Sequence, residues 1–246
     1  MRITIFNGSP HKEQGNTHIM VEALTAGARE AGAEVENVFL ADREINPCIG
    51  CFACWFKTPG RCIHRDAMDQ LLPKIVESDV IGFATPLYVD NVSGILKNFM
   101  DRLIPLVDPH METDEHGETR HLRIHEKPRY VLSVSNCGFP EQSHFEVLRV
   151  LFRRVARNMN CRLLAEVYRG GGPLLATTDP DLRPFAEQYK VLLHAAGKEA
   201  VGHLGLSHET IERLEQPLLP DPNYAEIYRQ RTNRRFDERL AGEANP

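Results

Sequence analysis

Four of the six cysteines in this 246-residue chain lie close together and could bind a metal centre. They are Cys48, Cys51, Cys54 and Cys62, with the spacing C-x2-C-x2-C-x7-C. Four thiolates can complete a 4Fe-4S cluster, and this spacing lets the first three converge from one tight turn. The residues leave three other interpretations open: cysteines packed as small apolar groups, a zinc ion held by four thiolates, and a redox-active dithiol of Cys51 and Cys54.

A second candidate site is the loop of small and polar residues 7–17, Asn-Gly-Ser-Pro-His-Lys-Glu-Gln-Gly-Asn-Thr, which runs directly into a predicted helix. Such a loop presents free backbone N–H groups and the positive end of the helix dipole to an anion. Ser9, Asn16 and Thr17 add short side-chain donors. We therefore expect a bound phosphate group, with ordinary helix capping by Asn16 or Thr17 as the alternative. The loop matches neither the dinucleotide fingerprint G-x-G-x-x-G nor the Walker motif.

The elements that must position these residues alternate between strands and helices. Apolar or β-branched runs predict five strands, at residues 2–6, 34–40, 79–85, 129–135 and 161–168. Helical spacing of apolar residues predicts five helices, at 16–31, 66–75, 93–106, 141–158 and 182–197. This order predicts an α/β fold, a flavodoxin-like doubly wound five-stranded parallel sheet of order 2-1-3-4-5. Such a sheet binds its ligand at the carboxyl ends of strands one and three.

The rest of the chain divides into loops and an appendage. Pro47, Gly50, Pro59 and Gly60 predict a cysteine loop at 46–63 rather than a helix. Residues 108–127 are polar and rich in histidine, and we interpret them as a surface excursion whose histidines are solvated rather than metal ligands. We expect a flavodoxin-like domain over residues 1–202 and a polar C-terminal extension over 203–246, with weak helices at 207–216 and 224–240.

Two motifs carry a family resemblance. The first combines Gly8-Ser-Pro10 with Gly15-Asn-Thr17, and the second is Thr85-Pro-Leu-Tyr-Val-Asp-Asn-Val-Ser-Gly94, continued by Ile-Leu-Lys-Asn-Phe-Met-Asp-Arg102. Together they resemble the NAD(P)H-dependent FMN reductase and iron–sulfur flavoprotein group over roughly residues 1–170. The resemblance implies an FMN held by the first loop, by the loop after strand three and by the loop after strand four. The implied contact residues are Ser9, His11, Asn16, Thr17, Pro86, Leu87, Tyr88, Val89, Asn91, Cys137 and Gly138.

The same resemblance bears on the cysteines. Their compact motif is similar to that of the iron–sulfur flavoproteins, with a last gap of seven residues at the long end, and it implies a 4Fe-4S cluster. Ile49, Phe52, Trp55 and Phe56 are expected to shield it from water. One departure is that relatives often carry Asp-Asp-Met after the last cysteine, where this chain has Asp66-Ala67-Met68. For two of the flavin residues a structural interpretation stays open: Tyr88 as a half-buried strand-end tyrosine and Cys137 as a packed thiol.

Composition excludes several partners. The net charge of −5 and the pI of about 6.1 give no basic face for nucleic acid or an anionic membrane. No uncharged run approaches the roughly 20 residues of a membrane helix. We expect a cytoplasmic protein, in which clustered cysteines stay reduced. The arginines at 231, 234, 235 and 239 are interpreted as a solvated helix face, with binding of an NADPH phosphate as the alternative.

The expected function is that of an FMN-dependent NAD(P)H oxidoreductase that passes electrons to a small-molecule or protein acceptor. Hydride transfer to a flavin requires no side-chain acid or base, so no catalytic residue is assigned. The resemblance also implies a homodimer or homotetramer. The alternatives are a flavodoxin-like electron carrier without a nicotinamide site and a non-flavin regulatory module. The sequence does not choose between NADH and NADPH.

Overall fold

The computed structural model describes residues 1–243 and is built on a five-stranded parallel sheet. The spatial order is β2-β1-β3-β6-β7, and every neighbouring pair is parallel. These strands are β1 (Arg2–Asn7), β2 (Glu34–Phe39), β3 (Val80–Pro86), β6 (Tyr130–Asn136) and β7 (Arg162–Arg169). The central strand β3 is buried at all seven positions, as expected for a parallel strand covered on both faces. The predicted doubly wound fold and strand order are confirmed.

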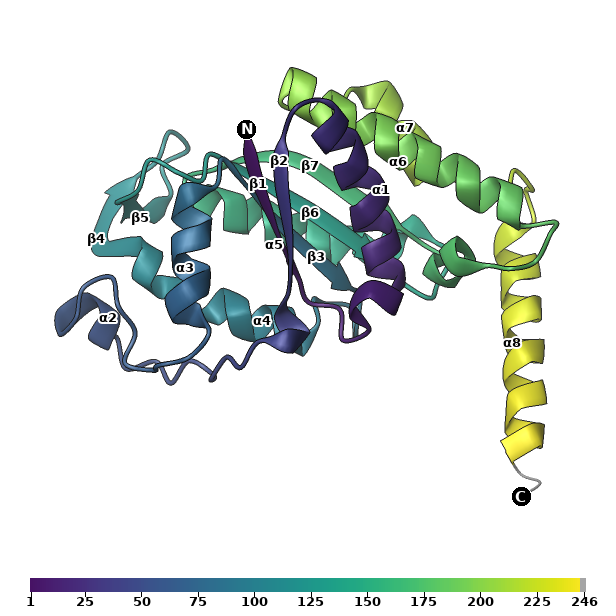
Figure 1. Cartoon of the computed structure of the whole chain (residues 1–246), viewed down its shortest axis with the longest axis horizontal. Coiled ribbons are helices and arrows are strands. Elements are labelled where there is room, and N and C mark those ends of the chain that lie inside the picture. Colours follow the sequence, from purple (N-terminus) through teal and green to yellow (C-terminus); the bar gives the residue numbers. More distant parts are fainter. Residues whose placement is uncertain (244–246) are drawn as a thin grey trace.

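Helices cover both faces of the sheet and form two apolar cores (Figure 1). One core contains residues of α1 (Asn16–Glu30) and α6 (Arg183–His203). The other contains residues of α3 (Met68–Glu77), α4 (Gly94–Asp101) and α5 (Glu146–Asn158). The helices α1 and α6 pack backbone to backbone, because a Cβ on Gly197 would lie only 1.9 Å from the Leu24 carbonyl oxygen.

The polar excursion predicted at 108–127 contains regular structure that the sequence analysis missed. It forms an antiparallel hairpin of β4 (Val107–Thr113) and β5 (Thr119–Arg123). Its turn is closed by Asp114, whose carboxylate accepts the backbone N–H groups of His116 and Glu118 at 3.0 and 2.9 Å. Arg157 of α5 pairs with the same carboxylate at 2.7 Å. The hairpin is therefore stabilised by the hydrogen bonds of Asp114 in its turn and by the ion pair with Arg157, rather than by alternating apolar side chains.

Several element boundaries differ from the predicted ones. The helix predicted at 93–106 ends at Asp101 and gives way to the 3-10 turn η3 (Ile104–Leu106), which contains Pro105. The helix predicted at 141–158 begins as the 3-10 segment η4 (Gln142–Phe145). The cysteine loop contains one short helix, α2 (Ala53–Phe56). Three further 3-10 segments are η1 (Lys12–Gln14), η2 (Leu40–Asp42) and η5 (Gly172–Ala176).

The C-terminal region consists of α7 (His208–Glu215) and α8 (Tyr224–Glu243). Leu214 of α7 is buried in the same core as α1 and α6. Helix α8 begins with the buried residues Tyr224 and Tyr228 and then leaves the body at the end opposite α2 (Figure 1). No helix within residues 1–243 is long and apolar enough to cross a membrane.

Candidate functional site

Three loops meet at the carboxyl edge of the sheet and are joined by hydrogen bonds into a closed circuit. Gly8, after β1, donates its N–H to the carbonyl of Ala84 at 2.8 Å. Leu87, after β3, donates its N–H to the carbonyl of Asn136 at 2.8 Å. The Asn136 side chain, at the end of β6, donates to the Thr17 hydroxyl at 2.8 Å. The first loop, the β3 loop and the β6 loop thus fix one another, at the edge where a doubly wound sheet binds its ligand.

Helix α4 reinforces this circuit through its N-cap residue, Ser93. Its hydroxyl donates to the Gly8 carbonyl at 2.7 Å and accepts the N–H of Leu96 at 3.2 Å. Its own N–H donates to the Thr85 hydroxyl at 2.9 Å. A Cβ on Gly8 would lie 2.6 Å from the Leu96 Cβ, so the close approach of α4 to the first loop requires glycine there.

The first loop has the features of an anion site. Gly15 is the N-cap of α1 and no side chain caps the helix, which corrects the alternative that Asn16 or Thr17 serves as cap. Within residues 1–243 the backbone N–H groups of Asn16 and Thr17 have no acceptor, and the first turn carries no acid. Ser9 is only 2% exposed, and a Cβ on Gly15 would lie 2.6 Å from its hydroxyl oxygen. The loop therefore leaves free donors around a space that a side chain at Gly15 would fill.

A further free donor lies at the base of this loop. Asn7 is fully buried, and its Oδ1 accepts the N–H of Ser9 at 3.0 Å. Its Nδ2 has no partner within the described residues. A buried donor left unpaired in this way costs free energy unless a ligand or water satisfies it.

The β3 loop makes a strained, tight turn that presents apolar surface. Tyr88 and Asn91 exchange backbone hydrogen bonds of 2.9 and 3.1 Å. The two residues between them, Val89 and Asp90, have φ of +48° and +55°, as in a type I′ turn. A β-branched residue rarely adopts positive φ, so Val89 stores strain. Its side chain is 98% exposed and that of Tyr88 45%, which provides a wall for a flat ligand.

The β6 loop carries the predicted contact residues Cys137 and Gly138 and also an exposed aromatic residue, Phe139, that was not predicted as a contact. Cys137 is buried, its thiol donates to the Phe139 carbonyl at 3.2 Å, and burial raises its pKa to about 11. Its thiol is therefore protonated and packed inside the loop, and its contact with FMN stays a prediction. Gly138 is exposed, and the Phe139 ring is 60% exposed and stacks on His144 with ring centroids 4.6 Å apart.

The other predicted flavin residues take different positions. Pro86 is buried at the end of β3 and Leu87 is half-buried beside it. His11 is exposed at the start of η1 and makes no side-chain hydrogen bond to the described residues. The Asn91 side chain accepts the N–H of Val92 at 2.8 Å and so stabilises its own turn. Asn7, Asn136 and Ser93 were not among the predicted site residues, although Asn7 and Asn136 directly follow predicted strands and Ser93 begins a predicted helix.

The four clustered cysteines line one small cavity. Cys48, Cys51, Cys54 and Cys62 are joined in its wall by Ile49, Phe52, Ile63, His64 and Ile104. All four are free thiols. Burial raises the pKa of Cys54, and the proximity of Cys62, Cys51 and Cys48 raises it further. The structure thus brings the thiols together, while no three His, Cys, Asp or Glu side chains in residues 1–243 form a group that could hold a metal ion.

Two of the four residues that were expected to shield a cluster line this cavity. Ile49 and Phe52 line it. The Trp55 indole instead donates to the carbonyls of Ile104 and Val107 at 3.3 and 3.0 Å, which anchors α2 to the start of the hairpin. Phe56 is 75% exposed to solvent.

A buried ion pair closes the neck of the cysteine loop. Asp66, just after the loop, accepts two hydrogen bonds from Arg102 at 2.6 and 3.2 Å, and both side chains are at most 2% exposed. The same carboxylate accepts the N–H groups of Asn46 and Met68, each at 3.0 Å. Although burial raises the pKa of Asp66, these hydrogen bonds, led by that from Arg102, lower it to about 2. We call these residues the Arg102–Asp66 clasp.

The clasp connects the two candidate sites through α4. Ser93 precedes this eight-residue helix and bonds to the first loop, whereas Arg102 follows it and bonds to both ends of the cysteine loop. A short rigid helix therefore positions the cysteine cavity relative to the carboxyl edge of the sheet.

Comparison with known proteins gives consistent matches. The family model for NADPH-dependent FMN reductase matches residues 1–159. An iron–sulfur flavoprotein of Methanocaldococcus jannaschii is 44% identical over 106 residues, which is 43% of this chain and 53% of that protein. The chain therefore matches only about half the length of this relative.

Solved structures share the fold at low identity. An NAD(P)H:quinone oxidoreductase from Methanothermobacter marburgensis aligns with a TM-score of 0.56 at 15% identity, covering 85% of this chain and 99% of that one. An FMN-dependent NADH-azoreductase from Bacillus anthracis, solved in complex with FMN, aligns with a TM-score of 0.57 at 15% identity, covering 83% and 99%. At 15% sequence identity, these alignments show that the fold is shared and nothing more.

Proposed function

Because the chain belongs to the NADPH-dependent FMN reductase family, we propose that it binds FMN at the carboxyl edge of its sheet and acts as an NAD(P)H oxidoreductase. The observation that carries this proposal is the hydrogen-bonded circuit of three loops around unpaired donors. The N–H groups of Asn16 and Thr17, with the Ser9 hydroxyl, suit the FMN phosphate.

The other loops suit the flavin ring. Tyr88 and Val89 present exposed apolar surface, and the tight turn between Tyr88 and Asn91 fixes their backbone. Phe139 adds an exposed ring from the β6 loop. When bound there, the flavin supplies hydride acceptance and electron transfer, and the protein supplies orientation and electrostatics. The electrons then pass to a small-molecule or protein acceptor that approaches the exposed edge.

Steady-state kinetics of the FMN-loaded protein test this activity. We expect oxidation of NADPH or NADH that accelerates when an artificial quinone acceptor is added. An FMN-loaded protein that is not reduced by either nicotinamide would instead be an electron carrier. A protein that does not bind FMN would be a non-flavin module, and the proposal would fail.

The cavity lined by all four clustered cysteines favours a second redox centre in addition to the flavin. We propose that Cys48, Cys51, Cys54 and Cys62 ligate a 4Fe-4S cluster, because four free thiols around one small space are the donor set such a cluster uses. Since no three of them form a metal-holding group within residues 1–243, the cluster would have to draw the thiols closer together. The similarity to the iron–sulfur flavoprotein of Methanocaldococcus jannaschii supports this assignment. Anaerobically purified protein should contain about four irons and matching acid-labile sulfide per chain. FMN without iron or sulfide would leave the cysteines as packed thiols.

A further inference from the structure

A groove lies between η5, the segment 177–182 that follows it, and α8. Its volume is about 840 Å³. It is lined from η5 and the next segment by Leu174, Thr177, Thr178 and Asp179, and from α8 by Tyr224, Tyr228, Arg231, Thr232 and Arg235, among others. Asn16 of the first loop also lines it, so the groove opens beside the proposed FMN phosphate site.

The charge of the groove is opposite to that of the chain. The chain has a net charge of −5, whereas the groove is lined by two arginines and a single acid, Asp179. Arg231 is 4.0 Å from Asp179, at the limit of an ion pair. Arg235 makes no hydrogen bond or ion pair to any residue of the described part of the chain. An anion in the groove would therefore meet two guanidinium groups with little competition.

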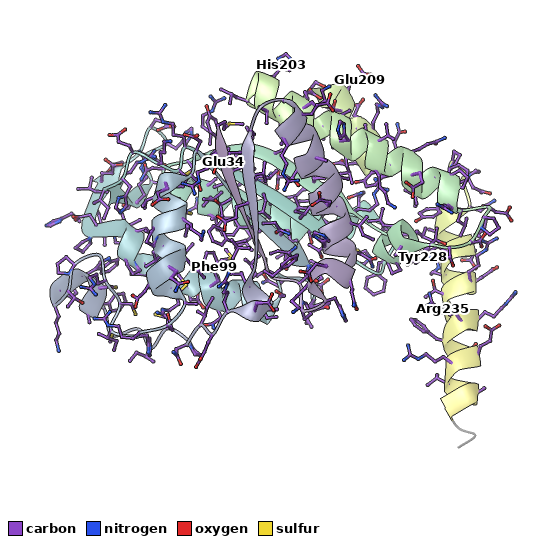
Figure 2. All side chains as sticks on the ribbon, viewed as in Figure 1. Glu34, Phe99, His203, Glu209, Tyr228 and Arg235 are labelled. Atoms are coloured by element: carbon purple, nitrogen blue, oxygen red, sulfur yellow. The ribbon has the colours of Figure 1, made fainter. Side chains whose placement is uncertain are left out.

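The two arginines are well placed to act together. Positions 231 and 235 are one helical turn apart on α8, so their side chains lie on the same face. Figure 2 shows Tyr228 near the base of α8 and Arg235 farther along its projecting part. Paired guanidinium groups bind phosphate oxygens with bidentate geometry and charge-assisted hydrogen bonds.

A buried tyrosine in the wall of this groove also lacks a hydrogen-bond partner. Tyr224 is only 4% exposed, and its hydroxyl makes no hydrogen bond within the described residues. A Cβ on residue 171 would lie 2.5 Å from this hydroxyl, so the position of the Tyr224 ring requires glycine at residue 171. Burial raises its pKa to about 12, so the hydroxyl keeps its proton.

We propose that this groove binds the phosphorylated adenosine end of NADPH, with Arg231 and Arg235 holding the 2′-phosphate. The proposal rests on the proposed NAD(P)H oxidoreductase function and adds the cosubstrate's site and its preference for NADPH over NADH. Arginine is the residue by which nucleotide sites accommodate a 2′-phosphate. Helix α8 lies outside the residues that the family model matches, so this preference would come from the chain's own C-terminal region.

Isothermal titration calorimetry with 2′,5′-ADP and with 5′-AMP, on the FMN-loaded protein, tests the site. We expect 2′,5′-ADP to bind at least roughly tenfold more tightly than 5′-AMP, the effect of one or two hydrogen bonds to charged groups. The variants R235Q and R231Q/R235Q should remove this difference and leave the FMN content unchanged. R234Q is the matched control, because Arg234 lies on the same helix but does not line the groove.

The proposal is overturned if the double variant binds 2′,5′-ADP within twofold of the parent, or if R234Q weakens binding as much as R235Q does. Its failure is distinguishable from failure of the oxidoreductase function. Arginine-dependent binding of 2′,5′-ADP by a protein that does not oxidise NADPH would keep the groove and reject the activity. NADPH oxidation with an unchanged KM in the double variant would keep the activity and reject the groove.

Discussion

Single residues at the carboxyl edge decide whether FMN fits. The first loop carries the unpaired Nδ2 of Asn7, the free N–H groups of Asn16 and Thr17 and the buried hydroxyl of Ser9. Because a buried unpaired donor is costly, a phosphate that accepts hydrogen bonds from this loop would stabilise it. The phosphate space at the start of α1 stays open because no side chain caps this helix and because Gly15 has no Cβ.

Replacing Gly15 with alanine tests this arrangement. The new Cβ would lie 2.6 Å from the Ser9 hydroxyl oxygen, which narrows the phosphate space. We expect G15A to weaken FMN binding by at least about tenfold, the loss of one charge-assisted hydrogen bond, as measured by fluorescence titration. The control is G202A in α6, where nothing lies within 4 Å of the added Cβ. Equal affinity of G15A and the parent would contradict the assigned phosphate position.

The strain at Val89 can be measured directly. Glycine adopts positive φ without penalty, so V89G should raise the free energy of unfolding of the FMN-free protein by about 1 kcal/mol. The comparison variant is V150G on the exposed face of α5, which should lower it by roughly 0.5 kcal/mol because glycine is a poor helix former. Urea denaturation gives both values. A fall in both variants would show that the turn at Val89 is not strained.

Part of this residue-level picture was predictable from the sequence. The small residues and the helix start identified the first loop, and the spacing of the cysteines anticipated that they gather. The roles of Asn7 and Asn136 were not predictable, because each depends on a partner brought by another strand or helix, such as Thr17, which is 119 residues from Asn136. Cys137 and Phe139 differ in exposure for the same reason, since the chain path after β6 decides which of them faces solvent.

At the scale of elements, helix α4 connects the two proposed sites. Ser93 fastens its start to the first loop, and Arg102 fastens its end to the neck of the cysteine loop. Removing one partner of a buried ion pair leaves an uncompensated charge, which costs about 3–5 kcal/mol. The helix therefore couples the geometry of the two proposed redox centres.

The clasp makes stability depend on pH. The pKa of Asp66 is lowered from its ordinary 3.8 to about 2, so the unfolded chain binds the proton more tightly than the folded one. The pair therefore stabilises the fold fully above about pH 4, and this contribution of about 2 kcal/mol is lost as the pH falls through about 2. Unfolding free energies of the parent measured between pH 5 and pH 2 should show this decline.

Two variants distinguish the contribution of Asp66 to the pH dependence of stability from that of other carboxylates. D66N should lack the Asp66 part of the decline and be less stable at pH 5. D69N, which removes an exposed carboxylate three residues farther along at the start of α3, should change stability by less than about 0.5 kcal/mol. If D66N and D69N behave alike across this pH range, the clasp does not stabilise the loop. The clasp itself was hidden from the sequence, because an arginine at the end of an amphipathic helix ordinarily lies in solvent.

The strand order was predictable because apolar runs alternate with helices, and parallel crossovers then restrict the topology. The β4–β5 hairpin was not predictable, because its residues are polar on both faces. It is held by the Asp114 turn and by Arg157, two features without a periodic signal.

On the scale of the whole molecule, helix α8 has exposed apolar surface outside the groove proposed above. Beyond its buried tyrosines it projects from the body (Figure 1). On this part Phe236 is 56% and Leu240 66% exposed. Exposed apolar residues on a projecting element favour self-association. We propose that α8 contributes to a homo-oligomer, which agrees with the expectation from the sequence.

Light scattering coupled to gel filtration tests this proposal. F236S/L240S should lower the measured mass from that of a dimer or tetramer toward the 27.9 kDa of one chain, with FMN binding unchanged. V191S, which removes an exposed valine from α6, is the control and should leave the mass as it is. A parent protein that already has the mass of one chain would refute the proposed role of α8.

The central claim is that the three joined loops bind FMN, and an absorbance titration of purified protein with FMN under anaerobic conditions tests it most directly. The account predicts saturation at about one FMN per chain, since there is one such edge per sheet, followed by bleaching of the flavin band when NADPH is added. A flavin spectrum that stays that of free FMN throughout the titration, with all of the flavin removed by gel filtration, would contradict the account.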